Sequence, residues 1–136
     1  MKQATVLGLL LIALFVLNNC SSENLSALPE SSATYEALNA EVGCGSKYSD
    51  DKKKDVFESR YKDHWMTWRG EIVLADSDDI SLNIDGKGTQ DLQVDLADKQ
   101  AGYNLTKGTF VTVRFLMKTS GGCILPFSGD HATIVR

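Results

Sequence analysis

The residue types of a serine hydrolase lie close together near the end of the sequence. Ser128, Asp130 and His131 include a nucleophile, an acid and a base. In hydrolase triads the three groups converge from separate parts of the chain, and the serine stands at an exposed elbow. Three residues within four positions, beside Gly129, cannot easily form that relay. We therefore predict a turn here and expect no catalytic residues in this chain.

Two other short segments contain groups that bind metal ions or phosphate in other proteins. Asp76, Asp78 and Asp79 begin like a calcium loop, but Ile80 occupies the fifth position and no glycine occupies the sixth. Residues 86–89 (GKGT) resemble a phosphate loop, but they lack the upstream glycine and join two predicted strands. The two histidines have too few potential ligands nearby. We interpret these segments as turns and expect no metal and no cofactor.

The N-terminal residues have the features of a bacterial export signal. Lys2 supplies a positive charge, and residues 6–17 form an uncharged apolar run that is too short to cross about 30 Å of hydrocarbon as a helix. Residues 17–20 (LNNC) resemble the lipobox of bacterial lipoproteins, in which the cysteine is lipidated and becomes the new N-terminus. We predict a signal peptide over residues 1–19 and a lipid on Cys20.

The residue after the predicted lipid site indicates a destination. Ser21 resembles the second residue of lipoproteins that are sent to the outer membrane, so we expect the protein to face the periplasm from that membrane. The alternative is ordinary cleavage shortly after Cys20, which would leave a free periplasmic protein.

The charge balance argues against nucleic acid as the main partner. The chain has 14 basic and 18 acidic residues, a net charge of −4; removing residues 1–19 takes away Lys2 and no acid, which leaves 13 against 18, or −5. Nonspecific nucleic-acid affinity comes from Lys and Arg that neutralise phosphates. The longest basic run, residues 52–54, is flanked by Asp residues and indicates a solvated helix face.

Cys44 and Cys123 remain as a pair once Cys20 is lipidated or removed. In an oxidising compartment such a pair is most simply a disulfide. The alternative, two thiolate ligands of a metal, lacks a C-x-x-C motif or a nearby pair of histidines.

After the predicted lipid site, the sequence divides into a tether and a folded domain. Residues 20–45 are rich in Ser, Asn, Ala and Glu with Pro29 among them, and indicate a flexible tether, although residues 32–38 could form a helical turn. We place a folded domain over residues 46–136. It begins with a helix of about four turns, capped by Ser49, whose apolar stripe extends to Trp65.

After Trp65 the apolar residues alternate with a period of two, which is typical of strands. The expected strands cover residues 67–74, 80–84, 92–96 and 110–117, with a loop or short helix over 97–108. A last extended portion over residues 123–125 and 132–135 is interrupted at Pro126 and Gly129, so we expect an edge strand or a broken one.

This order predicts a mainly β domain: a five-stranded, OB-fold-like Greek-key barrel preceded by an α-helix. Residues 68–73 (WRGEIV), followed by residues 105–113 (LTKGTFVTV), resemble the bacterial tRNA-anticodon-like OB-fold family. Members of that family are often exported or lipid-anchored and carry a preceding helix. The resemblance covers about residues 50–136 and departs from the family pattern at Arg114-Phe115, where a glycine is usual. The chain is also similar to the OB-fold family of small periplasmic stress proteins.

The fold class directs attention to one face, because OB-folds bind across strands two and three and the adjoining loops. The expected ligand-binding residues are Asn83, Asp85, Gln93, Asp95 and Tyr103. These polar and acidic side chains suit a cation, a peptide or a sugar better than DNA, whose bases stack on aromatic side chains.

We therefore expect a non-catalytic binding or assembly module of the cell envelope, joined to the membrane by its lipid and open to an envelope protein partner. Three alternatives stay open. The first is a soluble periplasmic protein that binds a small ligand, cation or oligosaccharide, the second a single-stranded nucleic-acid binder, and the third an enzyme with an unrecognised site near His131.

Overall fold

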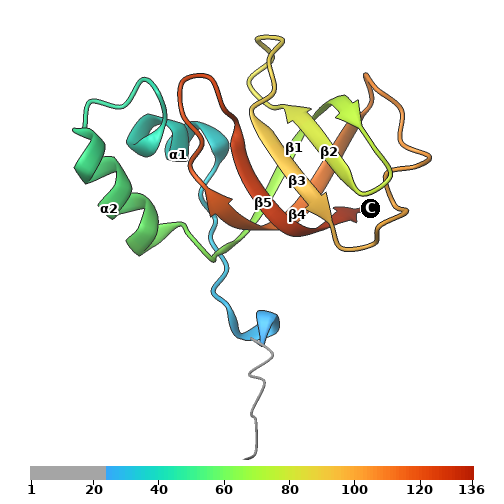
Figure 1. The fold of residues 1–136 in the computed structure, drawn as a ribbon, viewed down its shortest axis with the longest axis horizontal. Helices are drawn as coiled ribbons and strands as arrows, with labels where there is room; N and C mark the ends of the chain where they lie inside the picture. The colour runs from blue at the N-terminus through green and yellow to red at the C-terminus, as the bar shows by residue number, and fades with distance from the viewer. Residues whose placement is uncertain (1–23) are drawn as a thin grey trace, which may run out of the picture.

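The computed structural model describes residues 24–136, so the predicted signal peptide and the predicted lipid site at Cys20 lie outside the described residues. Two α-helices lie beside a five-stranded barrel (Figure 1). In chain order the elements are η1 (Leu25–Ala27), α1 (Tyr35–Val42), α2 (Asp50–Arg60), β1 (Trp65–Ala75), β2 (Asp79–Asn83), β3 (Leu92–Leu96), β4 (Phe110–Thr119) and β5 (Phe127–Val135). No helix among the described residues is long and apolar enough to cross a bilayer.

The five strands close into a barrel in the order β1-β2-β3-β5-β4. Neighbouring strands are antiparallel, except that β3 and β5 run parallel. Alternate residues of β4 point into the barrel, and Val113, Phe115 and Met117 are fully buried. The predicted mainly β class, the five strands and the inward face of β4 are confirmed.

The last strand differs from the prediction. β5 is one continuous strand that pairs with both β3 and β4, so it is neither an edge nor broken, and residues 123–125 belong to the preceding loop. Gly129 does not interrupt it. A Cβ at this position would lie 2.4 Å from Cδ2 of Phe115, so glycine allows β5 to approach the aromatic core.

The prediction of a flexible tether over residues 20–45 is wrong for the part that is described. The indole N–H of Trp65 donates to the carbonyl of Leu25 at 2.9 Å, and that of Trp68 donates to the carbonyl of Ala33 at 2.8 Å. Residues 35–42 then form α1, and Leu38 on this helix is fully buried in the core. Composition suggested a tether because the polar residues of this segment face solvent while its few apolar residues face the barrel.

Helix α2 begins where it was predicted and ends one turn earlier. The Ser49 hydroxyl accepts a hydrogen bond from the Lys52 N–H, which confirms the predicted N-cap. The helix ends at Arg60, and Asp63, with φ of 57°, turns the chain into the barrel. Trp65 therefore starts β1 and does not extend the helical stripe.

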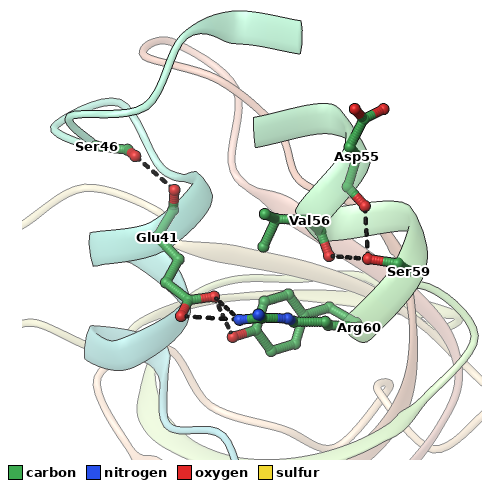
Figure 2. A network of polar contacts seen from close by, with 7 residues as sticks. Glu41, Ser46, Asp55, Val56, Ser59 and Arg60 are labelled. Carbon is green, nitrogen blue, oxygen red and sulfur yellow. Dashed lines mark hydrogen bonds and ion pairs between the residues drawn. The ribbon is translucent and has the colours of Figure 1, made fainter. Parts of the chain in front are cut away.

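The two helices are held together by the carboxylate of Glu41. Figure 2 shows this α1 carboxylate beside the guanidinium of Arg60 on α2, 3.4 Å away. The same carboxylate accepts a hydrogen bond from the Tyr61 hydroxyl at 2.6 Å. Burial and this hydrogen bond raise the pKa of Tyr61.

The predicted disulfide is present. Cys44 follows α1, Cys123 lies in the β4–β5 loop, and their Cα atoms are 4.7 Å apart. The bond closes a sequence separation of 79 residues and fastens the helical part of the chain to a barrel loop.

Candidate functional site

A pocket of about 480 Å³ opens at one end of the barrel, and we call it the loop pocket. Helix α1 contributes Tyr35 and Asn39 to its lining. The β2–β3 loop lines a second side, and the β4–β5 loop a third. Three segments that are distant in the sequence therefore meet around one cavity.

The buried carboxylate of Asp91 connects two of these segments. Asp91 is 7% exposed. Its Oδ1 accepts from the Tyr35 hydroxyl at 3.0 Å, and its Oδ2 accepts from the backbone N–H groups of Ile84 at 2.6 Å and Asp85 at 3.0 Å. Three hydrogen bonds offset the free-energy cost of removing this carboxylate from water. They also hold the three donor groups in place. Asp91 thus orders the pocket lining.

Tyr35 is the donor that reaches Asp91 from α1. Burial, followed by the hydrogen bond to Asp91, raises the pKa of Tyr35 well above its usual value. A tyrosine hydroxyl carries its proton at neutral pH, and here it donates that proton's hydrogen bond to Asp91. Its ring packs edge-on against Trp68 and Phe127, which fixes α1 on the barrel.

The β4–β5 loop forms one rim of the loop pocket and exposes two adjacent apolar side chains to solvent. Ile124 is 93% exposed and Leu125 is 70% exposed. The loop itself is restrained, because Cys123 is in the disulfide and the Gly122 N–H donates to the Leu125 carbonyl at 2.9 Å. The Phe127 N–H donates to the Asp91 carbonyl at 3.0 Å and fixes the loop's far end.

The structure does not bring the five predicted ligand-binding residues together. Asp85 lines the loop pocket. Asn83 is buried rather than exposed, and its Oδ1 accepts from the Gly86 N–H at 3.0 Å, so it shapes the turn. Gln93 and Asp95 are exposed on β3, and Tyr103 is 76% exposed in the β3–β4 loop.

These residues are spread out because alternation along a strand predicts its face but not the place where loops converge. Sequence reasoning found only Asp85 among the pocket residues, and those that it missed include Tyr35, Asp91, Ile124 and Leu125. One signal was present in the sequence: an adjacent apolar pair between Gly122 and Pro126, in a stretch that is otherwise a turn.

Ser128, Asp130 and His131 lie in strand β5. The turn predicted for these three residues is therefore wrong. The Ser128 hydroxyl shares a hydrogen bond with the Thr119 hydroxyl at 2.7 Å. Nδ1 of His131 lies 2.8 Å from its neighbour Asp130. His131 has a φ of 52° where the β4–β5 register shifts, which marks a β-bulge.

The acidic turn between β1 and β2 concentrates negative charge. Burial, and then the charges of Asp76, Asp78 and Asp95, raise the pKa of Asp79. Among residues 24–136, no group of three His, Cys, Asp or Glu side chains could hold a metal ion.

A second pocket of about 440 Å³ lies on the α2 side of the disulfide. Four lysines line it, but Lys53 is 3.1 Å from Asp50, and Lys118 is 2.8 Å from Asp63. Asp50 and Glu58 also line the cavity. Because carboxylates pair with two of these lysines and two more carboxylates line the cavity, we assign no anion site to it.

No protein-family model, no curated protein and no solved structure matches this chain. The geometry of the loop pocket is therefore the basis for assigning a function.

Proposed function

We propose that this protein is a non-catalytic, OB-fold-like binding module of the bacterial cell envelope, and that the loop pocket is its binding site. The observation that carries the proposal is the closed five-stranded barrel whose β3–β5 pair is parallel. This strand order supports a Greek-key barrel of the OB type, which binds ligands on the face of strands two and three and on the loops between strands one and two and between strands four and five. The last of these, the β4–β5 loop, lines the loop pocket. It also agrees with a kinship to the tRNA-anticodon-like OB-fold family.

The lining of the pocket supports binding rather than reaction chemistry. Hydroxyl and amide groups from Tyr35, Asn39, Thr89 and Gln90 surround a cavity large enough for a small ligand or a few residues of a peptide. The carboxylate of Asp91 is occupied by three donors, so it acts as a support for the lining.

The disulfide supports an extracytoplasmic location. Disulfides persist in oxidising compartments such as the periplasm and are rare in the cytosol. The Cys44–Cys123 bond therefore agrees with export directed by residues 1–19 and with a lipid on Cys20.

A lipid on Cys20 would hold the barrel close to the bilayer. Cys20 precedes Asn24 by four residues, which can span at most about 14 Å. The carbonyl of Leu25 accepts from the Trp65 indole N–H, and the carbonyl of Pro29 accepts from the Trp65 backbone N–H, so this segment is bonded to the start of β1. Figure 1 shows η1 at the bottom of the view and the β2–β3 and β4–β5 loops at the top. The pocket rim would thus face away from the membrane.

The first test is intact mass and membrane fractionation of the full chain in a bacterium that processes lipoproteins, with Cys20→Ala as the matched control. We expect a mature chain that begins at Cys20, carries acyl mass and sediments with membranes, and we expect Cys20→Ala to lose all three properties. A soluble wild-type chain that begins beyond Cys20 would disprove the anchor and favour the free periplasmic alternative.

The second test addresses the pocket. NMR spectra of the mature protein would be recorded with calcium, a neutral hexasaccharide, short peptides and a single-stranded oligonucleotide. Shifts confined to residues of the loop pocket support the proposal. Oligonucleotide binding that maps to the β2–β3 face and weakens steeply with salt would contradict it in favour of the nucleic-acid alternative.

A further inference from the structure

We propose that the loop pocket receives a segment of a polypeptide partner in which a large apolar side chain stands next to a Lys or Arg. This inference rests on the proposed function, because it names the partner class for the same pocket.

The apolar requirement comes from the β4–β5 loop. Ile124 and Leu125 present adjacent aliphatic side chains to water on a loop that is already restrained by the disulfide and by two backbone hydrogen bonds. Removing exposed aliphatic surface from water is favourable in proportion to the area that is buried. Because the loop is held in place beforehand, little conformational entropy is lost when a partner covers it. A ligand with an apolar side chain gains binding free energy by covering this rim, whereas a purely polar sugar does not.

The basic requirement comes from the charges of the pocket. Asp85 and Asp91 are the charged side chains that line it, and no Lys, Arg or His of the described residues does so. Asp91 is occupied by its three donors, and Oδ1 of Asp85 accepts from the Lys87 backbone N–H at 2.9 Å, which leaves Oδ2 of Asp85 to meet a ligand. The side chain of Asp85 is 21% exposed, so part of it is open to solvent.

Lys87 partly occupies the position that a partner's cation would take. Its Nζ lies 3.7 Å from Oδ2 of Asp85, but the Lys87 side chain is 81% exposed. Exposed pairs of this kind are weak, so an incoming cation can replace it. Lys87 therefore acts as an internal competitor, and its removal is expected to strengthen binding of a basic segment.

A peptide is favoured over a lipid surface by the acidic pocket and by its position. Anionic lipid would be repelled by Asp85, and the β2–β3 and β4–β5 loops that line the pocket lie on the opposite side of the barrel from η1 (Figure 1). A partner in the aqueous space can reach the rim directly.

The test uses three fluorescent peptides that contain Lys-Leu-Leu-Lys, Glu-Leu-Leu-Glu or Lys-Ser-Ser-Lys, titrated to about 1 mM against the mature protein by anisotropy. We expect the first peptide to bind and each of the others to bind at least about tenfold more weakly. Ile124→Ser should weaken the first peptide at least about tenfold, and Lys87→Gln should strengthen it about two- to fivefold. Leu74→Ser removes a 57% exposed leucine on β1 and should change nothing.

Several outcomes would overturn the inference. These are a lack of binding by all three peptides, equal binding by all three, and binding that Ile124→Ser leaves unchanged. Binding of anionic vesicles that depends on Ile124 would identify a lipid surface instead. A neutral hexasaccharide that shifts the pocket resonances while the peptides do not would overturn the partner class, but it would leave the proposed binding module standing.

Discussion

At the scale of single residues, the hydrogen bond between Tyr35 and Asp91 connects the aromatic core, in which the Tyr35 ring packs, with the lining of the loop pocket. The phenol donates to a carboxylate that is 7% exposed, from a position 56 residues away in the sequence. An unsatisfied buried acceptor costs about 1–3 kcal/mol, so this contact should be measurable in the free energy of unfolding.

Tyr35→Phe keeps the ring against Trp68 and Phe127 and removes the donor to Asp91. We expect it to lower the free energy of unfolding by about 1–3 kcal/mol, measured by urea denaturation. Tyr103→Phe removes a hydroxyl from a side chain that is 76% exposed, and should stay within about 0.5 kcal/mol of the wild type. Equal effects of the two substitutions would show that the buried hydrogen bond contributes little.

Asp79 makes stability depend on pH. Burial and neighbouring carboxylates raise its pKa in the folded state above the ordinary value of 3.8. Between these two pKa values the folded protein binds more protons than the unfolded chain, so the free energy of unfolding falls as the pH rises through that window.

Asp79→Asn removes the free-energy cost of holding an ionised Asp79 in the folded state. We expect the variant to be more stable than the wild type at pH 7 by about 0.5 kcal/mol or less, with the difference shrinking toward zero as the pH falls through the window. Thermal melts at several pH values measure this. Asp55→Asn, on the exposed face of α2, is the control and should show no such trend. An Asp79→Asn advantage that is constant with pH would contradict the assignment.

At the scale of elements, β5 depends on the absence of a side chain at Gly129. A Cβ there would lie 2.4 Å from a ring carbon of Phe115 and 2.7 Å from the carbonyl oxygen of Leu116. The neighbour is a fully buried aromatic ring, which has little room to move.

Gly129→Ala should therefore destabilise the protein by about 1–3 kcal/mol or more, seen as a fall of several degrees in Tm. Gly45→Ala is a matched control, because a Cβ at Gly45 would meet nothing within 4 Å. If Gly129→Ala and Gly45→Ala have the same Tm, β5 must lie farther from Phe115 than the structure places it.

At the scale of the whole molecule, the segment before the barrel is part of the fold. Tyr35, Leu38 and Val42 of α1 are buried in the common core with the strands. Full burial of such a side chain contributes about 1.5–3 kcal/mol, and a domain of this size is stable by about 5–15 kcal/mol in total.

A chain that starts at Ser46, the beginning of the domain predicted from the sequence, should therefore fail to unfold cooperatively, because it lacks α1, the donor to Asp91 and Cys44. A chain that starts at Asn24 should melt cooperatively. Near-ultraviolet circular dichroism during heating distinguishes the two. A cooperative melt of the shorter chain with an unchanged midpoint would show that residues 24–45 contribute little to the fold.

Local signals in the sequence were sufficient to predict part of the local structure. Alternation identified the inward face of β4, Ser49 marked the start of α2, and Gly86 and Gly88, with φ of 76° and 83°, mark the turn after β2. The pairing of Cys44 with Cys123 followed from the count of cysteines in a chain that is predicted to be exported. Each inference needed a few neighbouring residues or a composition, because capping, alternation and turn geometry act over short distances.

The features that define the candidate site required contacts between distant segments. The predicted tether became α1 because Trp68 binds the carbonyl of Ala33 across 35 residues and the barrel core covers Leu38. The predicted broken strand became β5 because closing the barrel gives both of its edges a partner. Whether a short apolar run or a carboxylate is buried depends on what packs over it, and that is decided by tertiary structure rather than by local sequence.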